Sequence, residues 1–438
     1  MKHHPVSRRS VLKGGGAALA GLSVLRVGVP EQVFGGQSGR SDVDAPDEAQ
    51  AGSAQAFPNT GGQVIPWLDQ PAPNPIPGGV GNLLDWEAID SFLTPANDFF
   101  FVQHYGQPSG LDEATWRVDV EGLVARPRSL TIADLKAEPH REVDFTLECS
   151  GNTAFDFFIG GIGTARWGGA RLSRVLQHAG ILDDATEVIF WGADRGTLTI
   201  RDNPGILSGG LTGTVTPDGE GGLDLTITEQ FARSMSVAEA LNSDNLLCYE
   251  MNGEPLPPEH GFPLRLIAPG WYGVANVKWL NRIEVTNRRF TGRFMARDYV
   301  SIREEQRDGE VLWTFANVGG DRLKSAPAKV VRLGNRYIVI GAAWGAAIAR
   351  VDVRIDNGPW RAADLVDRHP GKKNKSRGYA WNFWTFNWGM PSAGEHSVTS
   401  RAFDTDGNMQ PAPDDPFLAS RRTYWEANGH ITRRVLIP

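Results

Sequence analysis

The last third of this 438-residue chain is made of short segments in which apolar and polar residues alternate. In Arg350–Ile355 every second residue is apolar, and Asp356-Asn357-Gly358 follows as a turn signal. A period of two is typical of a strand that buries one face. Several such strands, with almost no helical pattern between them, predict a β-sandwich over residues 291–438.

Residues 64–290 have a different character, because strand-like and helix-like segments alternate between loops rich in Gly and Pro. Trp116–Val120 alternates like a half-buried strand. In Ser129–Ala137 a serine precedes apolar residues at helical spacing, which predicts a helix that begins after Ser129. We therefore predict the α+β class, with a mixed α/β domain over residues 64–290 followed by the β-sandwich.

The first residues have the layout of an export signal. Ser7–Lys13 contains two adjacent arginines, and the apolar stretch Gly14–Leu25 that follows is too short and glycine-rich for a transmembrane span. This pattern predicts twin-arginine export to the periplasm or another extracytoplasmic site, with no transmembrane domain in the mature chain. The alternative is a basic tail before a small apolar helix. From Gly35 to about Gln63 the chain has few large apolar residues, so residues 1–63 are predicted to be signal and disordered linker.

Composition excludes several classes of protein. The two cysteines, Cys149 and Cys248, exclude a disulfide framework and a four-cysteine metal site within one chain. Lys and Arg number 44 against 51 Asp and Glu, a formal net charge of −7, so the chain lacks the basic footprint of a nucleic-acid-binding protein. Any site for an anion must therefore be local.

Cys149 is the residue whose surroundings carry most chemical information. The apolar run Phe145–Leu147 leads to it, and the turn Ser150-Gly151-Asn152 follows, where a bulky group can approach the backbone closely. A thiol so placed can be a nucleophile or a soft ligand for a metal that favours sulfur. It can also be a small buried hydrophobe, which is the ordinary role of a lone cysteine and the one that we predict for Cys248.

Five segments, the first of which contains Cys149, follow one another in a characteristic order: Glu148–Asn152 (ECSGN), Gly163–Leu172 (GTARWGGARL), Tyr249–Pro257 (YEMNGEPLP), His260–Arg265 (HGFPLR) and Val277–Leu280 (VKWL). Together they resemble successive blocks of the sulfite oxidase family of molybdenum enzymes. Ser376–Trp381 (SRGYAW) is similar to a block in that family's immunoglobulin-like dimerisation domain. The resemblance extends from about Phe99 to the C-terminus. It implies a sulfite-oxidase-like molybdopterin-binding domain followed by an immunoglobulin-like β-sandwich that forms a homodimer.

The resemblance also implies a molybdenum–pyranopterin cofactor, with Cys149 as the protein ligand of the metal. A thiolate suits this role as a soft donor, and cationic side chains suit a pterin phosphate because they neutralise it. Tyr299 and Arg377 match positions where the family places a tyrosine facing the metal's oxygen ligand and an arginine for the substrate anion. The implied cofactor-binding residues are Phe101, Gln103, Tyr105, Cys149, His260, Arg265, Asn276 and Lys278, and the implied catalytic residues are Cys149, Tyr299 and Arg377.

Two places depart from the pattern of the sulfite oxidases proper. Gln103-His104-Tyr105 stands where those enzymes carry an Arg-Asn-His-like triplet, and Thr153–Phe158 stands where they place a further arginine. Both changes remove positive potential that would bind a small dianion. The implied reaction is oxygen-atom transfer that oxidises sulfite or another sulfur compound, larger or less charged. Reduction of an S-oxide is the alternative within the family.

The chain has no haem-binding domain ahead of the molybdopterin-like region. His369-Pro370-Gly371-Lys372 is superficially like a haem-ligand motif, but a second histidine and the surrounding helices are missing. We therefore predict that this chain binds no haem and passes its electrons to an external carrier such as a cytochrome c.

Two hypotheses outside this family stay open. The fourteen tryptophans would suit an exported carbohydrate- or ligand-binding protein without enzymatic activity, although aromatic residues in strands more often fill a core. Cys149 with His104 or His260 would suit a cysteine hydrolase. The tryptophans that lie close together in the predicted sandwich are Trp360, Trp381, Trp384 and Trp388.

Overall fold

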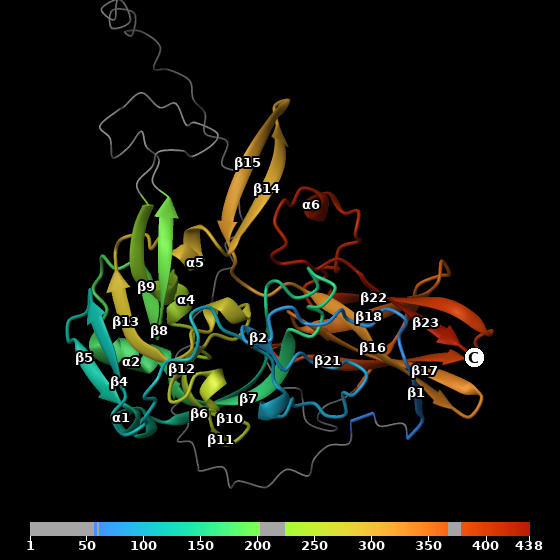
Figure 1. Ribbon diagram of the computed structural model, residues 1–438, viewed down its shortest axis with the longest axis horizontal. Coiled ribbons are helices and arrows are strands. Elements are labelled where there is room, and N and C mark those ends of the chain that lie inside the picture. The colour runs from blue at the N-terminus through green and yellow to red at the C-terminus, as the bar shows by residue number, and fades with distance from the viewer. Residues whose placement is uncertain (1–56, 59–60, 202–223, 367–377) are drawn as a thin grey trace, which may run out of the picture. The chain divides into compact units, whose positions relative to one another are not determined.

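The computed structural model describes residues 57–58, 61–201, 224–366 and 378–438 (Figure 1). Within these ranges the chain is mostly β-sheet with a few short helices, which confirms the predicted fold class.

The twin-arginine segment, His369 and Arg377 lie outside the described residues. Among the residues described, none of the helices has the length and apolar character needed to cross a membrane. The α-helices are α1 (Ile132–Lys136), α2 (Leu172–Ala179), α4 (Val237–Ala240), α5 (Arg293–Ala296) and α6 (Pro416–Ala419), and 3₁₀ helices span Ala96–Asp98, Pro258–His260 and Gly273–Ala275.

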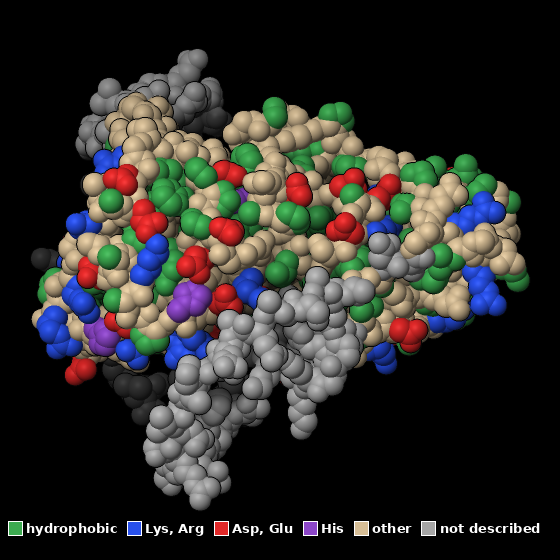
Figure 2. Space-filling model, turned by 90° about the horizontal axis from the view of Figure 1, so that it is seen from below, with side chains coloured by type: hydrophobic (Ala, Val, Ile, Leu, Met, Phe, Trp, Pro, Cys, Tyr) green, Lys and Arg blue, Asp and Glu red, His purple; other side chains and the backbone are tan. Residues whose placement is uncertain are grey.

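Charges of both signs are mixed on the surface. On the face shown in Figure 2, Asp and Glu side chains lie among Lys and Arg side chains. This mixture agrees with a net charge of only −7 over 438 residues. A strong local field must therefore come from individual groups in a cavity.

Two antiparallel sheets form the C-terminal β-sandwich. One has the strand order β1-β16-β17-β21-β20 and the other β19-β18-β22-β23. Their inner faces meet in one hydrophobic core, to which Val339 and Trp384 contribute from the first sheet and Val353 and Val398 from the second. The strands are β1 (Gln63–Ile65), β16 (Lys324–Leu333), β17 (Arg336–Trp344), β18 (Ile348–Ile355), β19 (Arg361–Ala362), β20 (Asp364–Leu365), β21 (Asn382–Gly389), β22 (Gly394–Asp404) and β23 (Ile431–Ile437).

The strand predicted at Arg350–Ile355 is part of β18. Val351 and Val353 are fully buried, and the chain leaves the strand at Asp356, which has a positive φ of 52°. The period-two pattern therefore identified both the strand and its inward face correctly.

The sandwich also includes the N-terminal end of the described chain. β1 pairs with β16, and Trp67 forms a bridge with Val435. Phe57 is buried, with its ring centroid 4.7 Å from that of Phe383. The linker predicted to extend to residue 63 therefore ends earlier, because Phe57 gains an apolar environment that only the folded sandwich supplies. The boundary predicted between residues 290 and 291 remains a prediction.

Two further sheets form the region before the sandwich. One has the order β11-β10-β7-β6, with β12 also paired to β10, and the other has the order β5-β4-β13-β8-β9. β13 and β4 are parallel, whereas the other pairs are antiparallel. The strands are β4 (Arg117–Gly122), β5 (Arg128–Thr131), β6 (His140–Glu148), β7 (Ile162–Arg171), β8 (Glu187–Arg201), β9 (Asp224–Ser236), β10 (Leu246–Met251), β11 (Glu254–Pro255), β12 (Arg265–Ile267) and β13 (Leu280–Thr286). Two sheets of two strands each complete the described strands: β2 (Val80–Gly81) with β3 (Phe101–Val102), and β14 (Val300–Arg307) with β15 (Glu310–Asn317).

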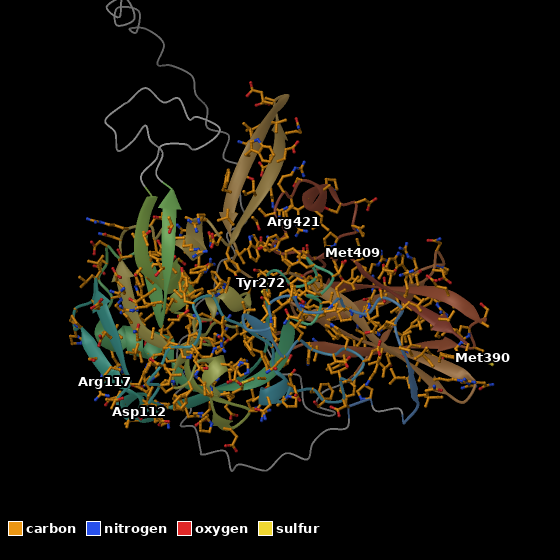
Figure 3. The ribbon with its side chains drawn as sticks, viewed as in Figure 1. Asp112, Arg117, Tyr272, Met390, Met409 and Arg421 are labelled. Carbon is orange, nitrogen blue, oxygen red and sulfur yellow. The ribbon has the colours of Figure 1, made fainter. Side chains whose placement is uncertain are left out.

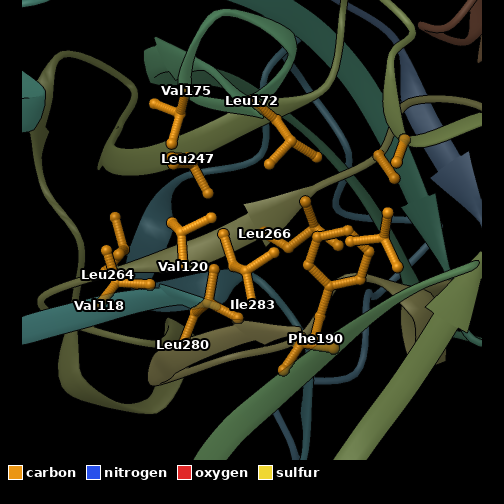
Figure 4. Packing of buried hydrophobic residues seen from close by; sticks show 14 of the residues in the cluster. Val118, Val120, Leu172, Val175, Phe190, Leu247, Leu264, Leu266, Leu280 and Ile283 are labelled. Atoms are coloured by element: carbon orange, nitrogen blue, oxygen red, sulfur yellow. The ribbon is translucent and has the colours of Figure 1, made fainter. Parts of the chain in front are cut away.

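These two sheets share one core. In β4, Arg117 points to solvent (Figure 3). Val118 and Val120 point inward and belong to the cluster that includes Leu247 of β10 (Figure 4). The strand predicted from the alternation in Trp116–Val120 is thus confirmed, apart from its first residue.

The helix predicted within Ser129–Ala137 is shorter than expected. Residues up to Thr131 belong to β5, and α1 begins at Ile132 with Thr131 as its N-cap. The Thr131 hydroxyl accepts from the Asp134 amide, and the Asp134 carboxylate accepts from Thr131 in return, which forms a capping box. The pairing of β5 with β4 therefore decides the start of this helix, not Ser129.

Candidate active site

Cys149 lies in a tight turn at the end of β6, which we call the cysteine turn (residues 149–152). The Cys149 amide donates to the Gly161 carbonyl at 2.9 Å. The Asn152 amide donates to the Cys149 carbonyl at 2.8 Å, and Asn152 Oδ1 accepts from the Gly161 amide at 3.0 Å. These bonds fix the backbone of the cysteine turn to Gly161, the residue directly before β7.

A buried ion pair supports the cysteine turn from the sandwich. Lys324 Nζ lies 2.7 Å from Glu148 Oε1, and both side chains are 0% exposed. Trp344 Nε1 donates to Glu148 Oε2 at 2.9 Å. Lys324 and Trp344 belong to β16 and β17, so the sandwich holds the residue directly before Cys149. Removing one partner of such a pair leaves an uncompensated buried charge, which is why it fixes position strongly.

Cys149 lines a pocket that we call the inner pocket. It encloses about 650 Å³ of space, part of it open to solvent. Most of the residues that the sequence predicted for the site converge here from distant segments. The predicted residues in it are Phe101, Cys149, His260, Arg265, Asn276, Lys278 and Tyr299. The other lining residues are Phe99, Phe100, Val102, His104, Leu147, Asp194, Phe231, Gly273, Val274 and Trp279.

Two cations of the inner pocket are held by backbone carbonyls. Arg265 donates to the His260 carbonyl at 2.8 Å and to a second carbonyl at 3.1 Å. Lys278 Nζ donates to the carbonyls of Val102 at 3.0 Å and Glu259 at 2.8 Å. In the part of the chain that the structure describes, neither cation forms an ion pair with a carboxylate. Their charge is therefore available to an anionic ligand.

Desolvation shifts the pKa values of the charged groups in the inner pocket. It lowers the pKa of Lys278 to about 7, with the neighbouring charge of Arg265 as the second cause. It also lowers the pKa of Arg265 to about 10 and raises the pKa of Asp194 to about 6. The negative charge of an anionic ligand would offset the free-energy cost of burying both cations.

The inner pocket fits an anionic organic cofactor with a soft metal. Arg265 Nε is buried without a hydrogen-bond partner. Within the described ranges no group of three or more His, Cys, Asp or Glu side chains could hold a metal ion, so a metal here needs ligands from a bound molecule. Burial raises the pKa of the Cys149 thiol to about 11, and a metal at sulfur would favour the thiolate. Cys149 would then be the protein's sulfur ligand, with Arg265 and Lys278 near the cofactor's negative charge.

Tyr299 pairs with a histidine that lines the same pocket. Its hydroxyl lies 2.7 Å from His104 Nε2. Desolvation lowers the pKa of His104 to about 3, with Lys278 and Arg293 as further causes, so the ring is neutral at pH 7 and can accept the phenol's hydrogen bond. The sequence analysis placed His104 in the triplet that departs from the family pattern and in the hydrolase hypothesis, and not beside Tyr299. No local pattern could reveal this contact, because the two residues are 195 positions apart.

A second pocket adjoins the first, and we call it the outer pocket. Gln103 and Tyr105 line the outer pocket and not the inner one, so the structure divides the predicted cofactor-binding residues between two cavities. The Tyr105 hydroxyl donates to Glu229 and accepts from Arg293 at 3.1 Å. Both pockets share Val102, His104 and Tyr299. The remaining lining residues of the outer pocket are Ile76, Gly79, Val80, Arg293, Phe294, Arg297, Asp298, Tyr424 and Trp425.

The Asn276 side chain forms hydrogen bonds to the backbone of its own loop. Asn276 Oδ1 accepts from the Ala268 amide at 2.7 Å, and Nδ2 donates to the carbonyls of Trp271 at 3.2 Å and Tyr272 at 3.1 Å. The loop in turn presents Arg265 and Lys278 to the inner pocket, since the Asn276 carbonyl accepts from Arg265.

The contacts of the two histidines disfavour the cysteine hydrolase. His104 is bonded to Tyr299, and His260 Nε2 is 3.0 Å from the Ala96 carbonyl. Among the described contacts neither ring is bonded to the Cys149 thiol. A nucleophilic cysteine needs a neighbouring base, whereas burial raises the pKa of this thiol.

Two of the four sandwich tryptophans disfavour the carbohydrate-binding protein, whereas Trp360 and Trp388 are partly exposed. Trp381 and Trp384 are 1% and 0% exposed, and their ring nitrogens donate to the Phe92 carbonyl and to Ser325 Oγ. These two rings fill a core and have no face free for stacking on a sugar.

Comparison with known proteins identifies similar families. Residues 104–205 and 212–294 match the oxidoreductase molybdopterin binding domain, and residues 322–430 match the Mo-co oxidoreductase dimerisation domain. These two matches include Cys149, Arg265, Lys278 and most of the sandwich, whereas Phe101, Gln103 and Tyr299 lie outside the matched ranges.

Individual relatives agree with the family matches. Sulfite oxidase of Gallus gallus is 32% identical over 349 residues, which cover 74% of this chain and 69% of that protein. Mitochondrial sulfite oxidase of Rattus norvegicus is 31% identical over 350 residues, which cover 74% of this chain and 58% of the rat protein. The sulfane dehydrogenase SoxCD from Paracoccus pantotrophus has a similar fold, with a TM-score of 0.65 over 91% of this chain and 96% of that chain at 22% identity.

Proposed function

This chain belongs to the sulfite oxidase family of molybdopterin-dependent oxidoreductases, and we propose that it transfers an oxygen atom from water to a sulfur compound. The sulfur compound gains one oxygen and loses two electrons, and the two protons of the water are released. The inner pocket carries the proposal, because one cysteine sulfur and two cations without carboxylate partners meet there.

The bound molybdopterin cofactor would supply the two-electron oxygen-transfer chemistry. Cys149 would hold the metal through its thiolate. Arg265 and Lys278 would bind the negative charge of the pterin phosphate by charge-assisted hydrogen bonds. His260 would bind the cofactor through the ring nitrogen that does not face the Ala96 carbonyl.

Tyr299, oriented by His104, would hold water in this reaction. The Tyr299 hydroxyl faces the inner pocket and is hydrogen-bonded to a neutral imidazole. Because the phenol's proton faces His104 Nε2, the Tyr299 oxygen is free to accept a hydrogen bond from water in the pocket. Gln103 and Tyr105 remain predicted contacts to the cofactor, and Arg377, outside the described residues, remains a predicted contact to the substrate.

The remaining parts of the proposal concern partners and location. The electrons leave for an external one-electron carrier such as a cytochrome c, with no haem in this chain. The match to a dimerisation domain supports a homodimer formed through the sandwich. The Arg8-Arg9 pattern with its apolar stretch supports twin-arginine export to the periplasm.

Cys149→Ser is the decisive variant, with Cys248→Ala as its matched control. We expect Cys149→Ser to lower turnover by roughly 100-fold or more, since changes even to residues behind a metal ligand cost about 10- to 100-fold. Cys248 is buried in β10 and lines neither pocket, so Cys248→Ala should keep its cofactor. Molybdenum content by mass spectrometry, pterin fluorescence, and turnover of sulfite or methyl phenyl sulfide with ferricyanide measure the outcome.

Two results would contradict the proposal. One is wild-type protein without molybdenum and pterin when it is produced in a host that loads a control molybdoenzyme. The other is full turnover in Cys149→Ser.

A further inference from the structure

A row of aromatic rings lines the outer pocket. The ring centroids of Tyr299 and Trp425 are 4.2 Å apart with 26° between the planes, and those of Trp425 and Tyr424 are 4.1 Å apart. Phe155 continues the row, with its centroid 4.8 Å from that of Tyr424. Tyr299 is buried, whereas Tyr424 and Phe155 are 42% and 44% exposed. We call these four residues the aromatic wall, which extends from the inner pocket to the surface.

The aromatic wall lies directly against the cysteine turn. A Cβ on Gly151 would meet Trp425 Cζ3 at 3.4 Å and Tyr424 Cε2 at 3.6 Å. The Glu426 amide donates to the Ser150 carbonyl at 2.7 Å, so the segment that carries both rings is bonded to the turn. A molecule that approaches the inner pocket through the outer one therefore passes these rings.

The charges of the outer pocket are paired with one another. Arg293 forms ion pairs with Asp298 and, at 3.7 Å, with Glu229. Arg297 Nε lies 3.0 Å from Asp298 Oδ1. Among the described residues that line this pocket, Arg293 and Arg297 share the carboxylate of Asp298, and His104 is neutral at pH 7. Glu229 pairs with Arg293 without lining the pocket. The described outer pocket offers aromatic surface and no uncompensated cation.

From this arrangement we propose that the substrate is a neutral organic sulfide, in which sulfur carries two carbon substituents and an apolar substituent lies against the aromatic wall. Sulfur is attracted to aromatic rings, and an apolar substituent is stabilised by leaving water. A small dianion gains neither contribution, and in the described outer pocket it would lose hydration beside arginines that already have carboxylate partners. This inference rests on the proposed function and names its substrate class.

The reaction balances for a simple member of this class. Methyl phenyl sulfide and water give methyl phenyl sulfoxide, two protons and two electrons. One S–O bond forms, the two O–H bonds of the water break, and the electrons go to the external one-electron carrier.

Binding of two molecules that cannot be oxidised further tests the inference. Titration calorimetry on the oxidised holoenzyme would compare methyl phenyl sulfone, which is neutral, with sulfate, which is a dianion. We expect the sulfone to bind more tightly than sulfate. Tyr424→Ala and Trp425→Leu should weaken sulfone binding by roughly three- to tenfold, as the loss of an aromatic contact with its phenyl ring implies, and leave sulfate binding unchanged.

Two further variants separate recognition from general effects. Trp425→Phe keeps an aromatic face, so its sulfone affinity should stay within about twofold of wild type. Trp313 is 53% exposed on β15 and lines neither pocket, so Trp313→Ala should leave both affinities unchanged. If Trp425→Leu fails to fold, the sulfone affinity of Tyr424→Ala tests the inference by itself, because Tyr424 is exposed.

The inference is overturned if sulfate binds more tightly than the sulfone, or if Tyr424→Ala and Trp425→Leu both bind the sulfone as well as wild type does. Faster turnover of sulfite than of methyl phenyl sulfide would overturn the inference and leave the proposed function intact. Absence of molybdenum, or of turnover with either compound, would instead contradict the proposed function.

Discussion

The inner and outer pockets adjoin one another but use their cations in opposite ways. In the inner pocket, Arg265 and Lys278 are bonded to backbone carbonyls and keep their charge uncompensated. In the outer pocket, Arg293 and Arg297 are paired with carboxylates. The number of cations around a cavity therefore does not set its potential, because their partners decide how much charge a ligand meets. An anionic cofactor suits the first pocket and a neutral substrate the second.

Lys324→Met gives the largest expected effect. It tests whether the partner of a cation contributes more to the free energy of unfolding than the burial of the cation does. Lys324 is more deeply buried than Lys278, but it is paired with Glu148. Its removal leaves a buried carboxylate without a counter-charge, so we expect the free energy of unfolding to fall by about 3–5 kcal/mol. Urea unfolding of the cofactor-free protein measures this. The double variant Glu148→Gln/Lys324→Gln should recover much of the loss, and an equal loss in both variants would show that pairing is not the cause.

Lys278→Met should act on the cofactor and not on the fold. It removes a cation that forms no ion pair with a carboxylate among the described residues. Asp194, which lines the same pocket and interacts electrostatically with Lys278, can take up a proton more readily once the cation is gone. Loss of one charge-assisted hydrogen bond should weaken retention of the pterin by roughly ten- to a hundredfold. Pterin and molybdenum content after gel filtration measure this. Lys136→Met is the control, because Lys136 is exposed and paired with Glu113; equal cofactor loss in the control would break the comparison.

The pH dependence of stability tests whether Lys278 is desolvated in the inner pocket. The pKa of Lys278 is lowered by desolvation from 10.5 to about 7, so the folded protein binds fewer protons than the unfolded chain between these pH values. The stability of cofactor-free wild type relative to Lys278→Met should therefore rise as the pH increases from about 7 towards 10.5. Chemical unfolding at several pH values checks the difference, and a constant or falling difference would refute the assignment.

Arg293→Gln should have the smallest effect. Its side chain is 25% exposed and its partners Asp298 and Glu229 are 27% and 19% exposed, so solvent screens these pairs in part, and we expect a loss of about 0–1 kcal/mol and unchanged cofactor content. Arg297→Gln, at a site that is 50% exposed, is the matched variant and should lose no more. If Arg293→Gln lowers cofactor content as much as Lys278→Met does, the two pockets do not differ as described.

Local features of the fold and the site could be predicted from the sequence. The period of two in Arg350–Ile355 identified a strand of the sandwich, and the small residues after Cys149 identified the cysteine turn. Each of these features depends on contiguous residues. The start of α1 could not be predicted, because Thr131 becomes the N-cap only once β5 pairs with β4.

The sequence by itself determined which strands alternate, where the thiol lies in its turn and which residue types are present to hold an anion, because periodicity and turn chemistry are local properties of the chain. Only the tertiary structure decided which cations keep their charge and which rings cover the cysteine turn. Glu148 meets Lys324 across 176 positions, and Tyr299 meets His104 across 195. The charge partners and the packing of a site depend on such distant contacts, which no pattern of neighbouring residues encodes.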